Sequence, residues 1–144
     1  MKKHVVLMAI LMVVCLFSLS SCGLLADSKE NIQLAKTTVE EFCKALSEDD
    51  EFTAINLIHP DTRPLTMYDL ALAIQELERQ KFVDFSDGIT LERCVAFNIA
   101  LYTSEYDGMA AEYTYKVKIG NQSATMKFLF VKNDAGYGIY SFGM

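Results

Sequence analysis

The sheet of this protein is decided by the stretch AAEYTYKVKIGNQSATMKFLF, residues 110–130. Apolar and polar side chains alternate on both sides of Gly120-Asn121, which is typical of two β-strands that turn one face to a core. A two-residue turn at Gly120-Asn121 places Tyr115 opposite Met126, so the apolar sets of the two strands meet on one face. The stretch therefore predicts an antiparallel hairpin.

Further strands extend this hairpin on both sides. A turn around Asp134-Ala135 places Phe130 opposite Ile139, so a final strand continues the same apolar face. A two-residue turn at Asp107-Gly108 would instead pair Ile99 with a lysine, and we expect a three-residue loop or a β-bulge with Gly108 there. The predicted strands cover residues 82–85, 91–104, 110–119, 123–132 and 137–142.

Three helices are predicted before the strands. The first starts at a capping-box-like Asp27-x-x-Glu30 and repeats apolar residues at helical spacing as far as Leu46. A short second helix over 52–58 ends at His59-Pro60, because the residue before a proline is pushed out of the α region. The third helix starts at Thr66. Helices followed by a strand meander predict an α+β fold in which N-terminal helices pack on a curved antiparallel sheet.

The third helix also carries two local expectations. Leu65 and Leu70 occupy the positions of a hydrophobic staple around the Thr66 cap, and we expect them to pack together. Met67, Leu70, Ile74 and Leu77 follow helical spacing and are expected to line the apolar face.

The first 22 residues have the order of a bacterial export signal. Lys2 and Lys3 precede thirteen consecutive apolar residues, 5–17, which are too few to span a bilayer but suit the apolar region of a secretory signal. Leu19-Ser20-Ser21-Cys22 then resembles the lipobox of bacterial lipoproteins. The resemblance implies diacylglycerol on the Cys22 sulfur, cleavage before Cys22 and acylation of the new N-terminus; an ordinary secretory signal is the alternative. The expected organisation is a signal peptide at 1–21, the lipidated Cys22 with a short tether at 22–28, and a single α+β domain at 29–144.

The charge of the chain limits its partners. The net charge of −6 argues against nucleic-acid binding, because neutralising phosphates needs clustered lysines and arginines. Removal of residues 1–21 loses two lysines and no acidic residue, which takes the net charge to −8. Membrane attachment is therefore expected through lipid on Cys22 and not through charge.

Sequence motifs of common enzymes and metal sites are absent. The chain contains no GxSxG, GxGxxG, HExxH or P-loop pattern. His59 is the only histidine after residue 21, so a histidine-rich site is excluded and a zinc site is not expected. The acidic run Glu48-Asp49-Asp50-Glu51 lacks the central glycine of an EF-hand loop and is interpreted as a solvated helix junction. We expect neither a metal nor a cofactor.

The order of elements resembles the nuclear-transport-factor-like cone fold, also called cystatin-like or SnoaL-like. The stretches FCKALSEDD, residues 42–50, and AINLIHPD, residues 54–61, carry the resemblance. It implies a cupped sheet whose concave face forms a pocket. Some relatives are enzymes with an aspartate and a tyrosine in the cup, and many are non-catalytic binding, scaffold or dimerisation domains. No aspartate of this chain aligns with the catalytic one, and no catalytic residue is assigned.

Five residues are candidates for a pocket. Tyr113 and Tyr115 are expected on the concave face, where a buried tyrosine hydroxyl needs a hydrogen-bond partner. His59, Asp61 and Tyr68 are expected around the connection between the second and third helices, and His59 could titrate near neutral pH. In the plainer interpretation the tyrosines are ordinary sheet residues and His59-Pro60-Asp61 ends a helix.

An interaction surface is expected on the other face of the sheet. It is an apolar cluster near the last strands, which suggests a partner unless a loop covers it. The partner would be a second copy of the chain or another protein of the cell envelope. The candidate residues are Leu129, Val131, Tyr140 and Phe142.

Cys43 and Cys94 are expected to be free thiols. Cys43 lies on the buried face of the first helix, while strand alternation places Cys94 opposite the Phe97 face that should pack on the helices. The two Cα atoms are then too far apart for a disulfide. A bulge near Cys94 would reverse this argument.

The sequence thus favours a membrane-anchored lipoprotein outside the cytoplasm, on the cell membrane or outer membrane, whose domain binds a ligand or protein without catalysis. A small isomerase- or hydrolase-like enzyme that uses the concave pocket is the alternative. A third possibility is an inhibitor or immunity-type protein whose acidic helical half masks a basic target.

Overall fold

The computed structural model describes residues 29–144. Cys22, the predicted signal peptide, the tether and the start of the first helix lie outside the described residues. The first helix is described over residues 29–47. The chain divides into two units between Lys36 and Thr37, and the sheet and the remaining helices belong to the second unit, residues 37–144. Among the described residues no helix has both the length and the apolar character needed to cross a bilayer.

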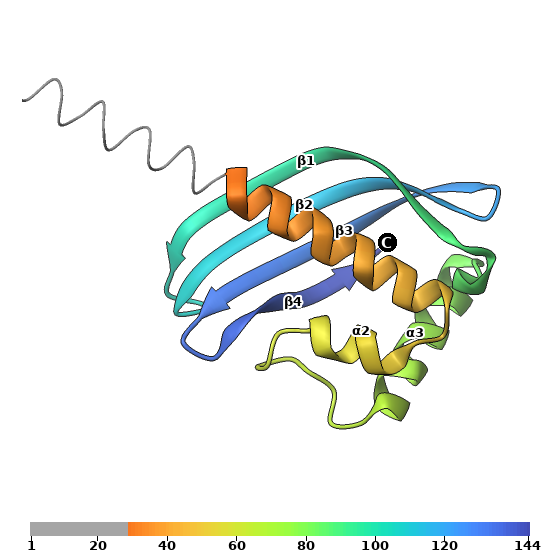
Figure 1. The fold of residues 1–144 in the computed structure, drawn as a ribbon, viewed down its shortest axis with the longest axis horizontal. Coiled ribbons are helices and arrows are strands. Elements are labelled where there is room, and N and C mark those ends of the chain that lie inside the picture. Colours follow the sequence, from red (N-terminus) through yellow and green to blue (C-terminus); the bar gives the residue numbers. More distant parts are fainter. Residues whose placement is uncertain (1–28) are drawn as a thin grey trace, which may run out of the picture. The chain divides into compact units, whose positions relative to one another are not determined.

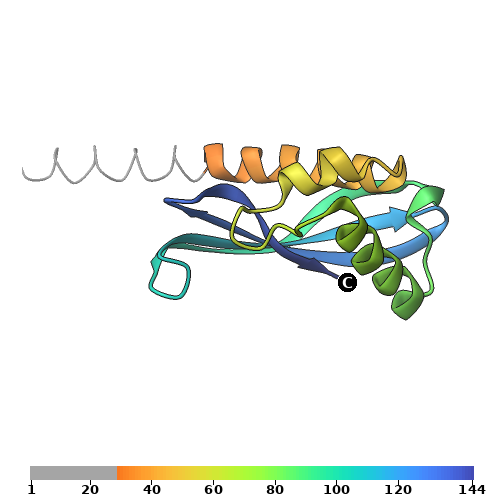
Figure 2. The same cartoon turned by 90° about the horizontal axis from the view of Figure 1, so that it is seen from below.

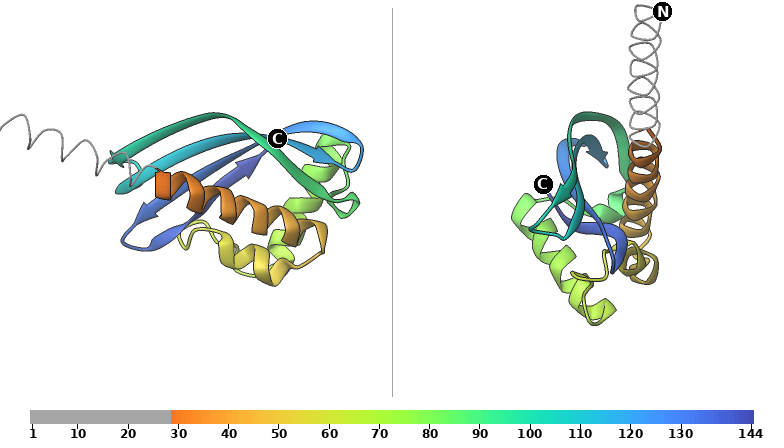
Figure 3. Two further views of the ribbon diagram at one scale, coloured as in Figure 1. Left: turned by 45° about the horizontal axis from the view of Figure 1, so that its top comes forward. Right: turned by 90° about the vertical axis from the view of Figure 1, so that its left-hand side faces the viewer.

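The fold is α+β, as predicted: helices precede a four-stranded antiparallel meander in the order β1-β2-β3-β4 (Figure 1). The strands twist and bend along their length (Figure 3). After residue 47 the elements are α2 (Glu51–Leu57), α3 (Met67–Lys81), a 3-10 turn η1 (Phe85–Asp87), β1 (Ile89–Thr103), β2 (Gly108–Ile119), β3 (Gln122–Asn133) and β4 (Gly136–Gly143).

The hairpin of β2 and β3 has the predicted register. Tyr115 pairs with Met126 and Tyr113 with Phe128, without a bulge from Ile119 back to Met109. Gly120 adopts a positive φ of 57°, which the tight turn requires and which glycine adopts without a steric penalty. The predicted pairing of Phe130 with Ile139 in β4 is also confirmed.

The pairing of β1 with β2 is irregular. Register shifts occur between Leu91 and Arg93, between Cys94 and Ala96, and between Ala100 and Thr103. The expected irregularity near Gly108 is present, but the turn has four residues, 104–107, and Asp107 takes the positive φ of 51° in place of Gly108. The bulges lie within β1 itself, because each extra residue is left unpaired on that strand.

The helix segment 37–47 lies over one face of the sheet (Figure 2), and its buried side chains contribute to the core there. Phe42 is fully buried, and its ring centroid lies 6.2 Å from that of Phe128 and 4.8 Å from that of Phe142. These edge-to-face contacts join the helix to β3 and β4. The remaining buried apolar side chains of this helix segment are Val39, Cys43, Ala45 and Leu46.

The start of α3 has the predicted cap but not the predicted packing. The Thr66 hydroxyl accepts from the Asp69 N–H at 3.1 Å, and the Asp69 carboxylate accepts from the Thr66 N–H at 3.1 Å, which is a capping box. Leu65 is 97 % exposed and Met67 is 49 % exposed, so neither the staple nor Met67 on the apolar face is found.

The predicted strand 82–85 is wrong. Phe82 ends α3 in the left-handed region at φ 56°, and Phe85 opens η1 with a fully buried side chain. The apolar residues at 82–85 end α3 and begin a short turn. A run of apolar residues looks the same in sequence whether it forms a strand or the end of a helix.

Candidate functional site

His59 is fully buried and fastens the chain after α2 to β4. Its Nε2 donates to the Gly136 carbonyl at 3.1 Å, and its Nδ1 accepts from the Asp61 backbone N–H at 3.1 Å. These partners assign the neutral tautomer with the proton on Nε2. The backbone N–H of His59 also donates to the Ile139 carbonyl at 2.9 Å. Both ring nitrogens are therefore occupied by backbone groups.

Gly138 lets this connection lie directly on the backbone of β4. A Cβ atom at Gly138 would lie 2.7 Å from the His59 backbone nitrogen and 2.9 Å from the Leu57 carbonyl oxygen. Ile58 and Ile139 form a parallel bridge at the same place. The absence of a side chain at Gly138 is thus a condition for the buried position of His59.

Asp61 belongs to a polar link that joins its own loop, the turn 104–107 and the end of β3. Its carboxylate accepts from the Asn133 amide at 3.0 Å, and the same amide nitrogen donates to the Tyr106 carbonyl at 3.0 Å. The carboxylate oxygen also lies 3.7 Å from Nδ1 of His59, beyond hydrogen-bond distance. A hollow of about 370 Å³ next to this link is lined by Asp61, Glu105, Asp107 and Asp134, among others.

Tyr113 and Tyr115 lie in the core of the sheet, on the face that meets the helix segment. Their ring centroids are 6.3 Å apart, and Phe130 meets Tyr113 edge-on at 5.8 Å. Burial raises the pKa of both hydroxyls. Among the described residues the Tyr113 hydroxyl is buried without a hydrogen-bond partner. The surrounding side chains are aromatic or apolar, with Met126, Phe128 and Phe130 all fully buried.

The candidate pocket residues are not brought together. The ring contacts and hydrogen bonds of His59 join it to Gly136, Asp61 and Tyr140, whereas Tyr113 and Tyr115 contact each other and phenylalanines. Tyr68 stands on the first turn of α3 with 70 % of its surface exposed. The structure thus has two separate features. One is His59, which fastens the chain after α2 to β4 and is called the histidine latch below. The other is the buried pair of Tyr113 and Tyr115 on the helix-facing side of the sheet, which is called the tyrosine face.

The candidate interface residues do not share one exposed face. A register shift between Leu129 and Phe130 turns Phe142 to the helix side, where it packs on Phe42. Val131 is fully buried, and Tyr140 meets His59 at a tilt and Tyr106 edge-on, with ring centroids 5.6 and 5.0 Å away. Leu129 is half-buried. Simple strand alternation placed Phe142 on the wrong face because the bulge in β4 reverses the faces beyond it.

The outer edge of β1 carries the exposed apolar surface instead. β1 is the first strand of the sheet and pairs on one side with β2 (Figure 1). Its apolar face was expected to pack on the helices, but this is wrong for Val95, Phe97 and Leu101, whose side chains are about half exposed or more. The exposed fractions are 48 % for Val95, 61 % for Phe97, 61 % for Leu101 and 66 % for Tyr102.

The sequence contains a feature that indicates the open edge of β1. Residues 94–104, CVAFNIALYTS, contain no charged residue and no proline. Natural sheet edges are usually protected by such residues, since an unprotected edge presents unpaired N–H and C=O groups to another chain. A long uncharged strand at the end of a sheet is therefore informative once its position is known.

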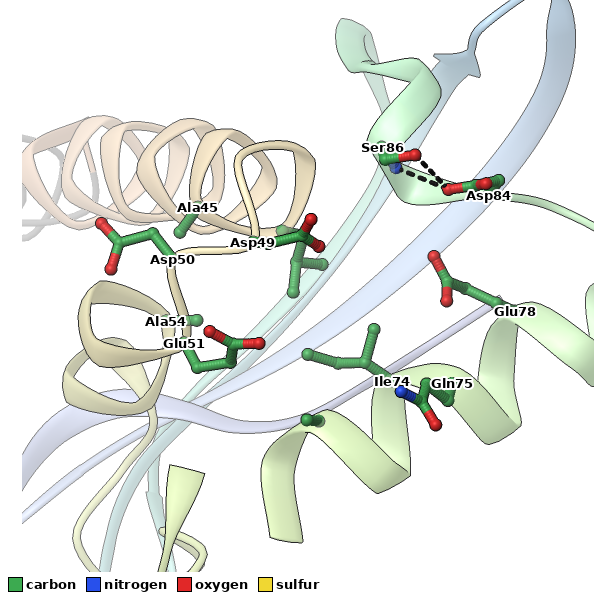
Figure 4. A pocket seen from close by; sticks show the side chains of 12 residues that line it. Ala45, Asp49, Asp50, Glu51, Ala54, Ile74, Gln75, Glu78, Asp84 and Ser86 are labelled. Atoms are coloured by element: carbon green, nitrogen blue, oxygen red, sulfur yellow. Dashed lines mark hydrogen bonds between the residues drawn. The ribbon is translucent and has the colours of Figure 1, made fainter. Parts of the chain in front are cut away.

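A second hollow, of about 230 Å³, lies where α2, α3 and η1 meet (Figure 4). Five carboxylates line it, and three of them serve local structure: Asp50 accepts from the Thr53 N–H, Asp84 from the Ser86 N–H and Glu78 from the Phe85 N–H. The Thr53 and Ser86 hydrogen bonds lower the pKa values of Asp50 and Asp84. The other two are Asp49 and Glu51. No group of histidine, cysteine or acidic residues within 29–144 is arranged to hold a metal ion.

Both described cysteines are free, as expected, but the argument from opposite strand faces was wrong, because the bulge that would reverse it is present near Cys94. Cys94 pairs with Tyr115 and Phe97 with Tyr113, so the bulge between Cys94 and Ala96 places both on the tyrosine face. Cys94 is exposed there, whereas burial, with a smaller contribution from Glu40, raises the pKa of the Cys43 thiol to about 12. Cys43 is thus an unreactive core residue at neutral pH.

Comparison with known proteins found no matching family model, no matching curated protein and no matching solved structure.

Proposed function

We propose that this chain is a lipid-anchored protein of the bacterial cell envelope whose domain binds another polypeptide without catalysis. The anchor is proposed on the order of residues 1–22, which ends in the lipobox-like Leu19-Ser20-Ser21-Cys22. It would hold the domain outside the cytoplasm, on the cell membrane or outer membrane. We also propose a cone-type fold, supported by the helix segment 37–47, whose Phe42 packs on one face of a bent antiparallel sheet.

The observation that carries the binding function is the outer edge of β1. Val95, Phe97 and Leu101 expose apolar surface along a strand with no charge from 94 to 104. An extended segment of a partner can add to such an edge through backbone hydrogen bonds, with side-chain contacts on both faces. Apolar surface of this kind is costly in water and is typical of an interaction site.

The geometry gives less support to an enzyme. In the part of the chain that the structure describes, the tyrosine face is filled by phenylalanines and Met126, and His59 is occupied by backbone groups. A catalytic site needs an acid or base inside a pocket with room for substrate. Neither His59 nor Asp61 contacts Tyr113 or Tyr115 there.

A second candidate is the masking of a basic target by the acidic helical half. The hollow of Figure 4, with its five carboxylates, supports it. Binding through this hollow would weaken steeply with salt, since exposed charges are screened within about 10 Å at 0.1 M ionic strength. Binding through β1 would change little, because the edge is uncharged.

Two measurements on bacterial cells test the proposal. Labelling with an alkyne analogue of palmitate should mark the chain, and Cys22→Ser should abolish the label; an unlabelled chain with intact residues 1–21 would overturn the anchor. A photo-crosslinking amino acid at Asn98 should give a covalent adduct with another polypeptide. The same amino acid at Ser123, an exposed polar residue in β3, should not. Equal adducts, or none, at the two positions would overturn binding at β1.

A further inference from the structure

We propose that the polypeptide bound at β1 is a second copy of this chain, paired antiparallel about a two-fold axis at Asn98. This inference rests on the proposed binding function of the β1 edge. Its product is a continuous sheet of two four-stranded halves, with one β1 strand lying against the other.

The bulges of β1 define where an added strand can pair. Ala96, Phe97, Asn98, Ile99 and Ala100 pair with consecutive residues of β2, and register shifts lie on both sides of this segment. A bulge breaks the regular alternation of outward N–H and C=O groups, so an added ladder is confined to the regular five residues. Asn98 is the middle residue, and a symmetric pair of these segments therefore has its axis there.

The side chains of the segment are complementary to their own copy. With the axis at Asn98, Phe97 lies opposite Ile99 of the other copy and Ala96 opposite Ala100. Phe97 is 61 % exposed in one copy, so pairing covers apolar surface beside Ile99. Cross-strand apolar pairs of this kind are what stabilises neighbouring strands.

The charges around the segment do not oppose pairing with a second copy and do not attract an acidic partner. Along β1 the charges nearest the segment are Glu92 and Arg93 on one side and Glu105 on the other, and the two-fold arrangement places Arg93 opposite the uncharged Thr103. In β2 the nearest charge is Glu112, which pairs with Asn98, and the two β1 strands separate it from Glu112 of the other copy. A copy therefore meets no like charge along the pairing edge, although the whole chain is acidic. An acidic partner segment would find no opposite charge within residues 94–104, and such charges are what select partners of that kind.

The proposed contact between the two β1 strands is small, and attachment to one membrane would increase how often it forms. A five-residue ladder buries much less than the roughly 1,200 Å² of a stable interface, so pairing is weak between freely diffusing molecules. A lipid anchor confines the copies to one surface and raises their local concentration, which strengthens a weak contact without new interactions. Pairing is therefore expected in the membrane and not in dilute solution.

Disulfide trapping of the full-length chain in native membranes tests the inference. With the axis at Asn98, the two residue-98 Cα atoms lie about 4.5 or 5.5 Å apart, within the range of a disulfide. Asn98→Cys in a Cys94→Ser background should form a covalent dimer of twice the chain mass on mild oxidation. Cys94→Ser alone and Cys94→Ser with Ser123→Cys should stay monomeric.

Charge changes at Ala96 and Ala100 test the register, because Ala96 of one copy lies opposite Ala100 of the other copy. In the trapping background, Ala96→Lys with Ala100→Lys should reduce the dimer fraction at least fivefold. Ala96→Lys with Ala100→Glu should retain it. Equal dimer fractions in the two variants, at equal resistance of the folded chain to protease, would overturn the register and the two-fold axis.

The outcomes separate this inference from the function on which it rests. A photo-adduct from Asn98 to a different protein, with no Asn98→Cys dimer, overturns the second copy and leaves binding at β1 standing. No adduct and no dimer overturn both. A dimer that contains two differently tagged copies of the chain supports both.

Discussion

Phe97 and Tyr113 lie opposite each other in neighbouring strands, yet Tyr113 is 1 % exposed and Phe97 is 61 % exposed. Their ring centroids are 6.5 Å apart with the planes inclined by 24°, so the edge residue covers one side of the core residue. Tyr113 has β3 on its far side, and Phe97 has no strand beyond it within the described residues. The pair therefore marks where the core ends and the open edge begins.

The buried hydroxyl of Tyr113 has no hydrogen-bond partner within residues 29–144, and its removal is predicted to stabilise the fold. Tyr113→Phe should raise the free energy of unfolding by about 1 kcal/mol, because a buried hydroxyl without a hydrogen bond is costly. Urea unfolding of the purified protein measures it. Tyr102→Phe is the control, since that hydroxyl donates to Asp107 at 3.0 Å on the surface, and its loss should leave stability nearly unchanged. A destabilised Tyr113→Phe would show that the hydroxyl has a partner.

The histidine latch predicts a large loss at position 59. His59→Ala removes a fully buried ring and leaves the Gly136 carbonyl and the Asp61 N–H without their partner. We expect the free energy of unfolding to fall by about 2–4 kcal/mol, the range of a core truncation with lost hydrogen bonds. Thermal unfolding measures this loss, and a variant as stable as the parent would show that the latch contributes nothing.

Gly138 and Gly143 of β4 offer a matched comparison that tests the close packing of residues 57–59 on this strand. Gly138→Ala should destabilise the fold by more than about 1 kcal/mol, because the new Cβ would meet the His59 backbone nitrogen at 2.7 Å. Gly143→Ala should be nearly neutral, since no atom lies within 4 Å of its Cβ position. The comparison uses the urea midpoint of each variant, and similar midpoints would argue against close packing of residues 57–59 on β4.

The two thiols should differ in reactivity and in their effect on pH stability. At pH 8 iodoacetamide should modify the exposed Cys94 rapidly and Cys43 only on unfolding, as mass spectrometry of the digested protein would show. In the unfolded chain Cys43 loses its proton near its ordinary pKa of about 9, whereas in the folded chain it does so near 12.

The sign of the pH effect follows from that difference. The Cys43 contribution to stability is fully present below pH 9 and is lost as the pH rises from 9 to 12, because the unfolded chain then binds fewer protons. Cys43→Ala should flatten this part of the profile. A profile unchanged by the substitution would mean that the thiol ionises as easily in the folded chain as in the unfolded one.

The central hairpin and the helix caps could be predicted from sequence because they depend on local rules. Strand alternation and a two-residue turn at Gly120-Asn121 are sufficient to set the register of β2 and β3. The Thr66 capping box is likewise a matter of residues three apart. His59-Pro60 ends the short helix as expected from the proline.

The outer strands could not be predicted in the same way. The side chains of Cys94 and Phe142 changed face because of bulges, and a bulge depends on the neighbouring strand as much as on the bulged sequence. The exposure of Phe97 depends on β1 being the last strand of the sheet, which no local pattern reports. The buried His59 required Gly136 and Gly138, nearly eighty residues away, to be seen beside it.

β1 has 15 residues and its partner β2 has 12, and the surplus is taken up in three places along the strand. At each place β1 has one residue more than the facing stretch of β2. Deletion or insertion of a single amino acid there alters β1 locally and leaves the turn at Gly120 and the strands beyond it in register. Among the strands, changes of length are therefore expected to be tolerated better at these three places in β1 than in the regular β2–β3 hairpin.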